Sequence, residues 1–454
     1  MSDLLHTLVS FLLALAILIA VHEFGHFWVA RRLGVKVRRF SIGFGRPLVR
    51  WVSRRDGTEY VLAGIPLGGY VKMLDEREEE VDPAEAHLAF NRQVLWKRTA
   101  IVLAGPLFNL AFAILLYWGI LVVGDTGSRA LIGTVEPGSI AAEAGLEAGD
   151  ELLWIGDRDT PTWEAAIFAL MAETLNGVDL PVRIRDVDGD ERLFVLDGRA
   201  LASLPEDPAI LTHLGLKPAR PPLPPVIGEV RPGEAAALAG LQPGDRILAT
   251  QGQAIPDWDA WVKLVRDHPG QPLRVRLARG DRELELELTP RPAASPEGEI
   301  GRVGAGVEVP EALLAQYRAE VRLGPLDAAR VAIQKTADMS WLMLKVMGRM
   351  LTGQASLEHL SGPISIAESA GRSASHGINY FIKFLAVVSI SLGVLNLLPI
   401  PLLDGGHLLF FLVEAVKGSP LSESLQMLGQ RVGVVLIAAL MSLAFYVDLQ
   451  RLLN

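Results

Sequence analysis

The chain has 454 residues, of which 50% are hydrophobic and 21% are charged. Together with a mean hydropathy of +0.31, this mixture predicts a membrane protein that also carries polar domains, because apolar and charged residues must be segregated along the chain. The formal charge of -9 argues against a nucleic-acid partner, since no broad excess of basic residues exists to neutralise phosphates. The absence of cysteine excludes disulfides and thiolate chemistry but leaves the compartment undecided.

Four apolar segments are expected to span a membrane. They fall within residues 1–32, 99–124, 378–416 and 431–449, with apolar cores at about 4–30, 99–123, 380–398 and 432–447. The last core is short for a span, which needs about 20 residues. The first segment carries Asp3, has no leading Lys or Arg and precedes no small-residue cleavage site. We therefore expect it to remain as an anchor rather than be removed as a signal peptide.

The basic residues predict the orientation of these spans. The loop from residue 31 to residue 55 has nine basic residues and no acidic one, so we expect it in the cytoplasm. Lys97 and Arg98 place the entry to the second span on the same side, and everything from about Asp125 to the third span is then outside the cytoplasm. Lys417 and Arg431 return the chain to the cytoplasm before the last span.

A His-Glu-x-x-His motif stands at residues 22–26, inside the first span. Two histidines four apart share one face of a helix, and their neutral imidazoles can bind one zinc ion. Glu23 is placed to take a proton from a water that the metal activates. Ionisable side chains at membrane depth are costly and usually mark function, which weighs against two histidines that are merely hydrogen-bonded within a helix bundle. At 1.5 Å per residue, His22 lies about 14 Å from the cytoplasmic end of the span, inside the bilayer and nearer its inner face.

Such a zinc site still needs a third protein ligand. The metzincin pattern does not continue after His26, because Val29 and Arg32 stand where Gly and His would be. The candidate is Asp404, which follows two prolines that interrupt the third span. Membranes tolerate such a break only where the backbone lines a protein interior or a wet cavity. As the third ligand, Asp404 would leave one position of the zinc open to water, as in catalytic sites. Two alternatives remain: His407 is the ligand instead, or Asp404 only caps a helix.

The outward segment contains an internal repeat with a constant offset of 95 residues. The pattern from residue 132 to residue 150 recurs from residue 227 to residue 245, and Trp163 recurs as Trp258. Each copy predicts a strand, a Pro-Gly turn, a short Ala-rich helix and a Gly-Asp turn into another strand. The copies resemble tandem PDZ domains, expected at 127–216 and 217–310 with a stiff Pro-rich linker at 217–225. PDZ domains bind peptide or protein ends, so the loops at Gly133 and Gly228 are candidate ligand sites; spacer domains without a ligand are the alternative.

Two further segments are predicted to lie at the membrane. Within the cytoplasmic loop at residues 33–98, residues 58–73 alternate loosely and predict a β-hairpin that turns at Gly68-Gly69. In the connecting region at residues 311–376, apolar and basic residues recur at near-helical spacing between residues 326 and 351. They predict an amphipathic helix on the outer membrane surface or, equally, a helix packed under the repeats.

These motifs together resemble the site-2 protease family of intramembrane zinc metalloproteases. The resemblance rests on the motif at residues 22–26, on the pattern N-x-x-P-x-P-x-L-D-G from Asn396 to Gly405, on the tandem repeat, and on the stretches 40–45, 64–73 and 105–109. It implies one zinc ion per chain, bound by His22, His26 and Asp404, with Glu23 as the base. Asn396 is implied to hold the substrate backbone or the developing oxyanion, and the hairpin with Gly68, Gly69 and Tyr70 to offer an edge to the substrate.

The fold that the resemblance implies is a polytopic α-helical protein of the bacterial inner membrane, with two extracytoplasmic PDZ domains and a cytoplasmic-side, membrane-associated β-hairpin. The implied substrates are single-span membrane proteins, such as anti-sigma factors and remnant signal peptides. They would be cut after a first cleavage, in regulated intramembrane proteolysis of an envelope stress response. A hairpin that only packs the loop remains possible. So do three other functions: a membrane-anchored zinc peptidase with a cytosolic active domain, a non-catalytic PDZ receptor and a zinc transporter.

Overall fold

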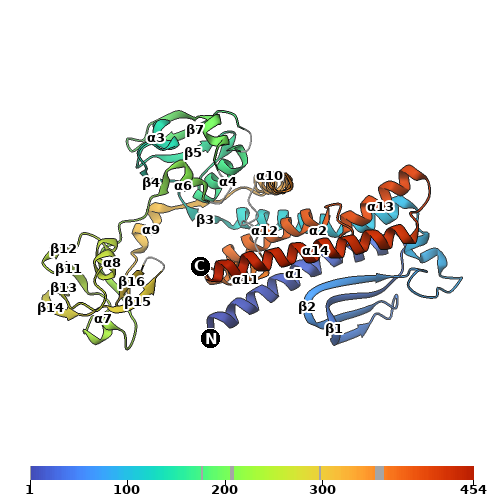
Figure 1. The fold of residues 1–454 in the computed structure, drawn as a ribbon, viewed down its shortest axis with the longest axis horizontal. Coiled ribbons are helices and arrows are strands. Elements are labelled where there is room, and N and C mark those ends of the chain that lie inside the picture. Colours follow the sequence, from blue (N-terminus) through green and yellow to red (C-terminus); the bar gives the residue numbers. More distant parts are fainter. Residues whose placement is uncertain (1, 175–176, 205–208, 296–297, 353–361, 454) are drawn as a thin grey trace. The chain divides into compact units, whose positions relative to one another are not determined.

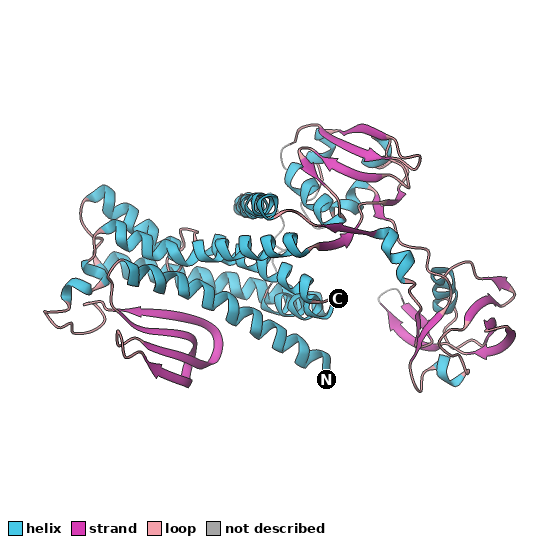
Figure 2. Ribbon diagram, turned by 180° about the vertical axis from the view of Figure 1, so that it is seen from behind, coloured by secondary structure: helices cyan, strands magenta, loops and turns pink. Residues whose placement is uncertain are grey.

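The computed structural model describes residues 2–174, 177–204, 209–295, 298–352 and 362–453. The chain forms two compact units, one from the residues up to Asp125 together with Val321–Leu453, the other from Thr126–Glu320. The first unit is mostly helical with one sheet, and the second is built of short strands and short helices (Figures 1 and 2). Each unit is described separately below.

Four helices of the described chain are long and apolar enough to cross a membrane, which confirms the expected number of spans. They are α1 (Ser2–Arg32), α2 (Leu95–Val123), α12 (Ile378–Asn396) and α14 (Glu423–Leu453). The last span is longer than predicted, since it covers Ser424–Arg451 instead of residues 432–447. The prediction began the span at Arg431, but one charge does not end a helix. The apolar pattern continues before it with Leu425, Met427 and Leu428.

Helix α2 is the central helix of the first unit, because it packs against α1, α12, α13 (Asp404–Lys417) and α10 (Pro325–Leu351). Its contact with α1 is close at the level of the zinc motif. A Cβ atom added to Gly25 of α1 would lie 2.5 Å from the backbone oxygen of Ala104 on α2. Glycine at this position therefore lets the two backbones approach where the histidines lie.

The predicted interruption of the third apolar segment is confirmed. Helix α12 ends at Asn396 and α13 begins at Asp404, so the segment predicted as one span at 378–416 is two helices. The connecting residues include Pro399 and Pro401, and Leu402 has a φ of 110°, which is rare for a residue with a side chain. The break places Asp404 in the first turn of α13.

The sheet of the first unit differs from the predicted hairpin. The two ends of residues 58–73 do not pair with each other, because both ends of β2 (Glu59–Met73) pair with β1 (Val37–Val52). Phe40 of β1 is paired with both Val71 and Tyr60, so the first half of β1 lies between the two ends of β2. The chain reverses direction within β2, but its two arms flank β1 instead of forming the predicted hairpin. Two short 3-10 helices, Ala86–Leu88 and Phe90–Arg92, follow the sheet.

The connecting region contains the predicted amphipathic helix as α10, followed by α11 (Pro363–Ser375). The small residues Ala328 and Ala332 of α10 are fully buried, whereas Leu326 and Trp341 are exposed. Within its unit α10 packs against α2 and α12. Its apolar face is therefore divided between helix packing and the surface.

The second unit confirms the repeat, because most elements occur twice in the same order; helices α5 and α6 of the first copy are replaced by strands β15 and β16 in the second. Each copy has a four-stranded sheet, in the order β6-β5-β7-β8 and β12-β11-β13-β14, and a two-stranded ladder, β4-β9 and β10-β17. The first copy comprises β4 (Ile132–Val135), α3 (Ile140–Glu143), β5 (Glu151–Ile155), β6 (Arg158–Asp159), α4 (Trp163–Thr174), β7 (Leu180–Arg185), β8 (Glu191–Leu196), α5 (Gly198–Ala202), α6 (Ile210–Leu214) and β9 (Leu216–Pro218). The second comprises β10 (Ile227–Val230), α7 (Ala235–Leu238), β11 (Arg246–Thr250), β12 (Gln253–Ala254), α8 (Trp258–Arg266), β13 (Leu273–Arg279), β14 (Arg282–Leu288), β15 (Arg291–Ser295), β16 (Gly298–Arg302) and β17 (Ala305–Val307).

The boundary between the copies lies slightly later than predicted. Strand β9 pairs with β4, so Lys217 and Pro218 belong to the first copy rather than to the linker. Helix α9 (Glu311–Tyr317) follows the second copy, and the strands β3 (Asp125–Ser128) and β18 (Arg318–Val321) pair where the chain enters and leaves the unit. Each copy has its own hydrophobic core, with Leu170 and Trp261 among the most buried side chains.

Candidate metal centre

Three side chains converge inside the helical unit. Oδ2 of Asp404 lies 3.1 Å from Nε2 of His22 and 3.5 Å from Nε2 of His26, and the two Nε2 atoms are 3.2 Å apart. The histidines are buried, and their rings meet edge to face with centroids 4.9 Å apart. Two imidazole nitrogens and one carboxylate oxygen around a common point form a donor set that suits zinc, with a fourth position left for water or substrate.

The backbone explains why these groups meet. His22 and His26 lie one turn apart on one face of α1. The proline break directs the start of α13, and with it Asp404, toward that face. Gly105 of α2 faces both imidazoles, since an added Cβ would lie 2.5 Å from Cε1 of His26 and 2.8 Å from Cε1 of His22. Only a residue without a side chain leaves the rings this space.

The other ring nitrogens of the two histidines both face α2. Nδ1 of His26 lies 2.8 Å from the backbone oxygen of Ile101, and Nδ1 of His22 lies 3.1 Å from Nδ2 of Asn109. Hydrogen bonds at this nitrogen fix the orientation of a ligating imidazole. Residues of α2 therefore contact the nitrogen of each imidazole that does not face Asp404.

Glu23 follows His22 on α1 and is half-buried. The strand β2 approaches it closely: a Cβ added to Gly69 would lie 2.9 Å from Cγ of Glu23 and 2.8 Å from the side chain of Ile19. The structure therefore brings Gly69, one of the predicted substrate-binding residues, to the carboxylate that we expect to act as the base.

The neighbouring hairpin residues have partners within the sheet. Gly68 has a φ of 144°, and a side chain there would collide with the ring of Phe44. Tyr70 stacks on Phe44 with ring centroids 6.0 Å apart, and its hydroxyl accepts a hydrogen bond of 3.0 Å from Arg39. Both residues therefore shape the strand next to Gly69.

The remaining predicted residues of the first unit lie at or near the proline break. Asn396 is the last residue of α12, directly before the break, and is half-buried. His407 lies one turn after Asp404 on α13, where its ring meets that of Phe410 edge to face. Among the described residues the group that could hold a metal consists of His22, His26 and Asp404, so the geometry favours Asp404 over His407.

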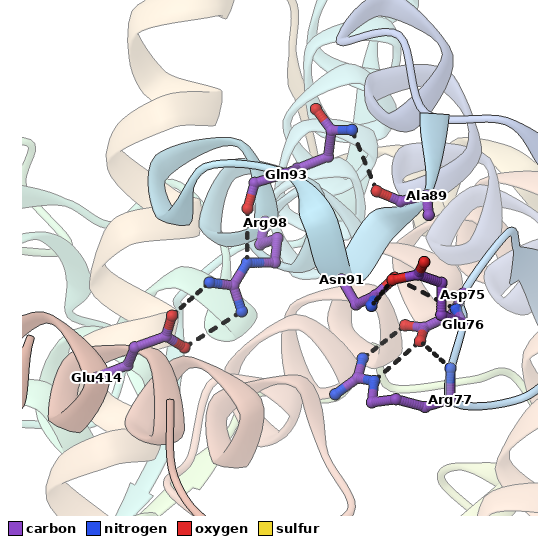
Figure 3. A network of polar contacts seen from close by, with 8 residues as sticks. All are labelled: Asp75, Glu76, Arg77, Ala89, Asn91, Gln93, Arg98 and Glu414. Atoms are coloured by element: carbon purple, nitrogen blue, oxygen red, sulfur yellow. Dashed lines mark hydrogen bonds and ion pairs between the residues drawn. The ribbon is translucent and has the colours of Figure 1, made fainter. Parts of the chain in front are cut away.

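Sequence reasoning missed an ion pair that fixes α13 against α2 (Figure 3). The guanidinium of Arg98 donates two hydrogen bonds, of 2.5 and 3.2 Å, to the carboxylate of Glu414, and both side chains are largely buried. Arg98 also donates to the backbone oxygen of Gln93 and lies over the ring of Phe411. The pair joins the first turn of α2 to the last turns of α13, the helix that carries Asp404. Opposite charges far apart in the sequence give no local signal of this contact.

The candidate ligand residues Gly133 and Gly228 lie in paired strands. Gly228 lies in β10, where an added Cβ would be 2.6 Å from the backbone oxygen of Val307 in β17; Gly133 is equally close to Ala219. These glycines allow close strand pairing. A cavity of about 440 Å³ in the second copy lies between α8 and residues 300–306, with Trp258 and Arg231 in its wall. The cavity is bordered by β17 and also by Glu229, the neighbour of Gly228 in β10.

A helical membrane unit with two histidines, a carboxylate and an adjacent glutamate in its interior has the arrangement of a membrane-embedded metallopeptidase. Comparison with known proteins agrees: the model of peptidase family M50 matches residues 10–440, and the chain belongs to this family. Proteins named Regulator of sigma-E protease RseP are 44% identical to it, over 456 residues in Salmonella typhimurium and over 453 in Escherichia coli, covering 100% of each chain. The name of a Vibrio cholerae relative, 41% identical over 455 residues and 100% of each chain, includes the words zinc metalloprotease. The chain is thus a zinc metalloprotease by family.

Proposed function

We propose that this chain is an intramembrane zinc endopeptidase that cuts single-span membrane proteins within or near the bilayer. The observation that carries the proposal is the convergence of His22, His26 and Asp404 inside a unit whose helices α1, α2 and α12 are apolar enough to span a membrane. A soluble peptidase would not need to place its metal ligands among such helices. The site belongs to the inner membrane of a bacterium, nearer the cytoplasmic face.

The three ligands hold one zinc ion, and Glu23 acts as the base. Zinc supplies Lewis acidity, which activates water and stabilises negative charge on a carbonyl oxygen. Glu23 takes the proton of the attacking water and returns it to the leaving amine. Asn396, at the end of α12, holds the substrate backbone or the oxyanion. The proline break leaves room for these polar groups at membrane depth.

The sheet presents the substrate to Glu23 as an extended strand. A helical substrate span hides its carbonyls and must be unwound before attack, and an unpaired strand edge stabilises the extended form. The end of β2 from Gly69 to Met73 pairs with β1 along one side, and no other described strand pairs with its second side. Several apolar side chains of the sheet are exposed, which suits insertion at the inner membrane surface; they include Phe44, Leu48, Val49, Trp51 and Leu62.

The two repeats act as PDZ domains outside the cytoplasm. They admit only substrates trimmed by a first cleavage, either by excluding bulky outer domains or by binding newly formed ends. The cavity beside α8 and β17 supports the second role, because an extended peptide end fits between a helix and a strand. The names of the relatives refer to regulation of a sigma factor. They favour anti-sigma factors as substrates, with remnant signal peptides as a second class, in an envelope stress response.

The central test is the variant Glu23→Gln in the full chain, purified in detergent with a single-span reporter. The amide cannot accept the proton of the attacking water, so we expect bound zinc to stay at one ion per chain while cleavage is lost. Glu78→Gln is the matched control, because Glu78 is an exposed carboxylate of the same unit. Asp404→Ala should lose both zinc and cleavage. Sustained turnover by Glu23→Gln, or zinc and activity both retained in Asp404→Ala, contradicts the proposal and reopens the receptor and transporter alternatives.

A further inference from the structure

Asn109 lies at the metal centre, but its contact with His22 joins two nitrogen atoms and leaves its side-chain oxygen without a partner among the described residues. It is on α2 and fully buried, with Nδ2 facing Nδ1 of His22 at 3.1 Å. Its Oδ1 accepts no hydrogen bond from any residue that the structure describes. A buried amide oxygen left without a donor costs about 1–3 kcal/mol, so such a group calls for a physical explanation.

The chemistry of His22 supplies one. If Nε2 of His22 offers its lone pair to a metal ion, the proton of the neutral ring is on Nδ1, which then needs an acceptor. The NH2 group of Asn109 can only donate. A half-turn of the amide about its Cβ–Cγ bond places Oδ1 against Nδ1 of His22, and this one rotation satisfies both groups.

The backbone at Asn109 is fixed well enough for such a contact. The hydroxyl of Ser389 on α12 donates a hydrogen bond of 2.8 Å to the backbone oxygen of Asn109, and both residues are fully buried. The other metal-facing ring already has the corresponding partner, since Nδ1 of His26 lies 2.8 Å from the backbone oxygen of Ile101 on the same helix. One helix thus faces the outer nitrogen of each imidazole.

We propose that Asn109 is a positioning residue of the metal centre: its side-chain oxygen accepts the Nδ1–H of His22 and so fixes the tautomer and the ring orientation. This inference rests on the proposed zinc site. Helix α2 then supplies one oxygen to each imidazole, from the backbone for His26 and from a side chain for His22. Only the second of these contacts can be removed by substitution.

The test compares Asn109→Leu, which keeps the size but removes the acceptor, with Asn109→Asp, which keeps an acceptor. Zinc affinity is measured on the full chain in detergent by competition with a chromophoric chelator. Loss of an outer partner weakens metal binding by about 10–100-fold, which we expect for Asn109→Leu, whereas Asn109→Asp retains most of the affinity. The cobalt(II) absorption spectrum should shift in Asn109→Leu and stay near that of the wild type in Asn109→Asp.

Thr99→Val is the control, because it removes another polar group of α2, one that is bonded to the backbone of Leu95 in its own helix. Wild-type zinc affinity and cobalt spectrum in Asn109→Leu overturn the inference. If Asn109→Leu does not fold, zinc binding by Asn109→Asp is the test. Retained zinc supports the inference. Loss of zinc overturns it if this variant unfolds at the wild-type temperature. Failure of the wild type itself to bind zinc refutes the proposed function instead.

Discussion

Replacing Gly105 by alanine tests the close contact between α2 and the two imidazoles. The added methyl group would lie 2.5 Å from Cε1 of His26 and 2.8 Å from Cε1 of His22, whereas carbon atoms in contact are about 3.5–4.0 Å apart. At least one ring must therefore move by about 1 Å. Metal–ligand distances tolerate only about 0.2 Å, and a misplacement of about 1 Å at a reacting centre can lower the rate by about 100-fold.

The same substitution should have the opposite effect on the helix itself. Alanine within a helix is more stable than glycine by about 0.5–1 kcal/mol, so the metal-free variant need not be destabilised. Gly119→Ala is the matched control on α2, because no described atom lies within 4 Å of its added Cβ. We expect Gly119→Ala to keep zinc and activity, and Gly105→Ala to lose most of both.

The assay combines chelator competition for zinc, cleavage of the reporter and thermal unfolding of the metal-free protein. It separates a damaged site from a damaged fold, because Gly105→Ala should lose zinc while unfolding at nearly the wild-type temperature. Equal zinc affinity in Gly105→Ala and Gly119→Ala would refute the reasoning that Gly105 makes room for the ligands.

Two further predictions concern charged pairs away from the metal. Arg98→Met leaves the largely buried carboxylate of Glu414 without its partner, which should lower the unfolding free energy by about 3 kcal/mol and reduce activity by loosening α13. The double variant with Glu414→Met should recover much of this loss. Additive effects of the two substitutions would contradict the pairing. In the first repeat, burial raises the pKa of Asp150 above 3.8, so folding favours its protonated form and the unfolding free energy falls as the pH rises through this raised pKa. Asp150→Asn should remove that fall, as followed by thermal unfolding at a series of pH values above about pH 4. The equivalent Asp245→Asn should destabilise instead, because Asp245 is bonded to Arg279 at 2.7 Å; equal effects in the two repeats would disprove this contrast.

The features that could be predicted from sequence are those with a local or periodic signal. His22 and His26 share a face because four residues make about one helical turn. The break before Asp404 follows from two prolines, whatever surrounds them. The repeat is visible because both copies keep glycine at the same turns, and the structure contains the same four-stranded sheet and two-stranded ladder twice.

The features that sequence reasoning missed depend on contacts between distant residues. The pairing of β1 with β2 is an example: the alternation at residues 58–73 indicates strands, but it does not say which strand lies beside them. The close approach of β17 to Gly228 is another example, because the partner strand is far away in the sequence. Asn109 is one polar residue on an apolar helix, and its importance appears only once His22 is placed opposite it.

The metal centre joins the beginning and the end of the chain. During synthesis and membrane insertion, α1 emerges early with two imidazoles, and Asp404 follows only after both repeats have been made. Closing so long a loop has an entropic cost, which the packing of α12 and α13 on α2 must offset before the third ligand is in place. Under the proposed zinc site, a chain that ends before Asp404 lacks the third ligand, so cleavage should begin only after α13 has been made.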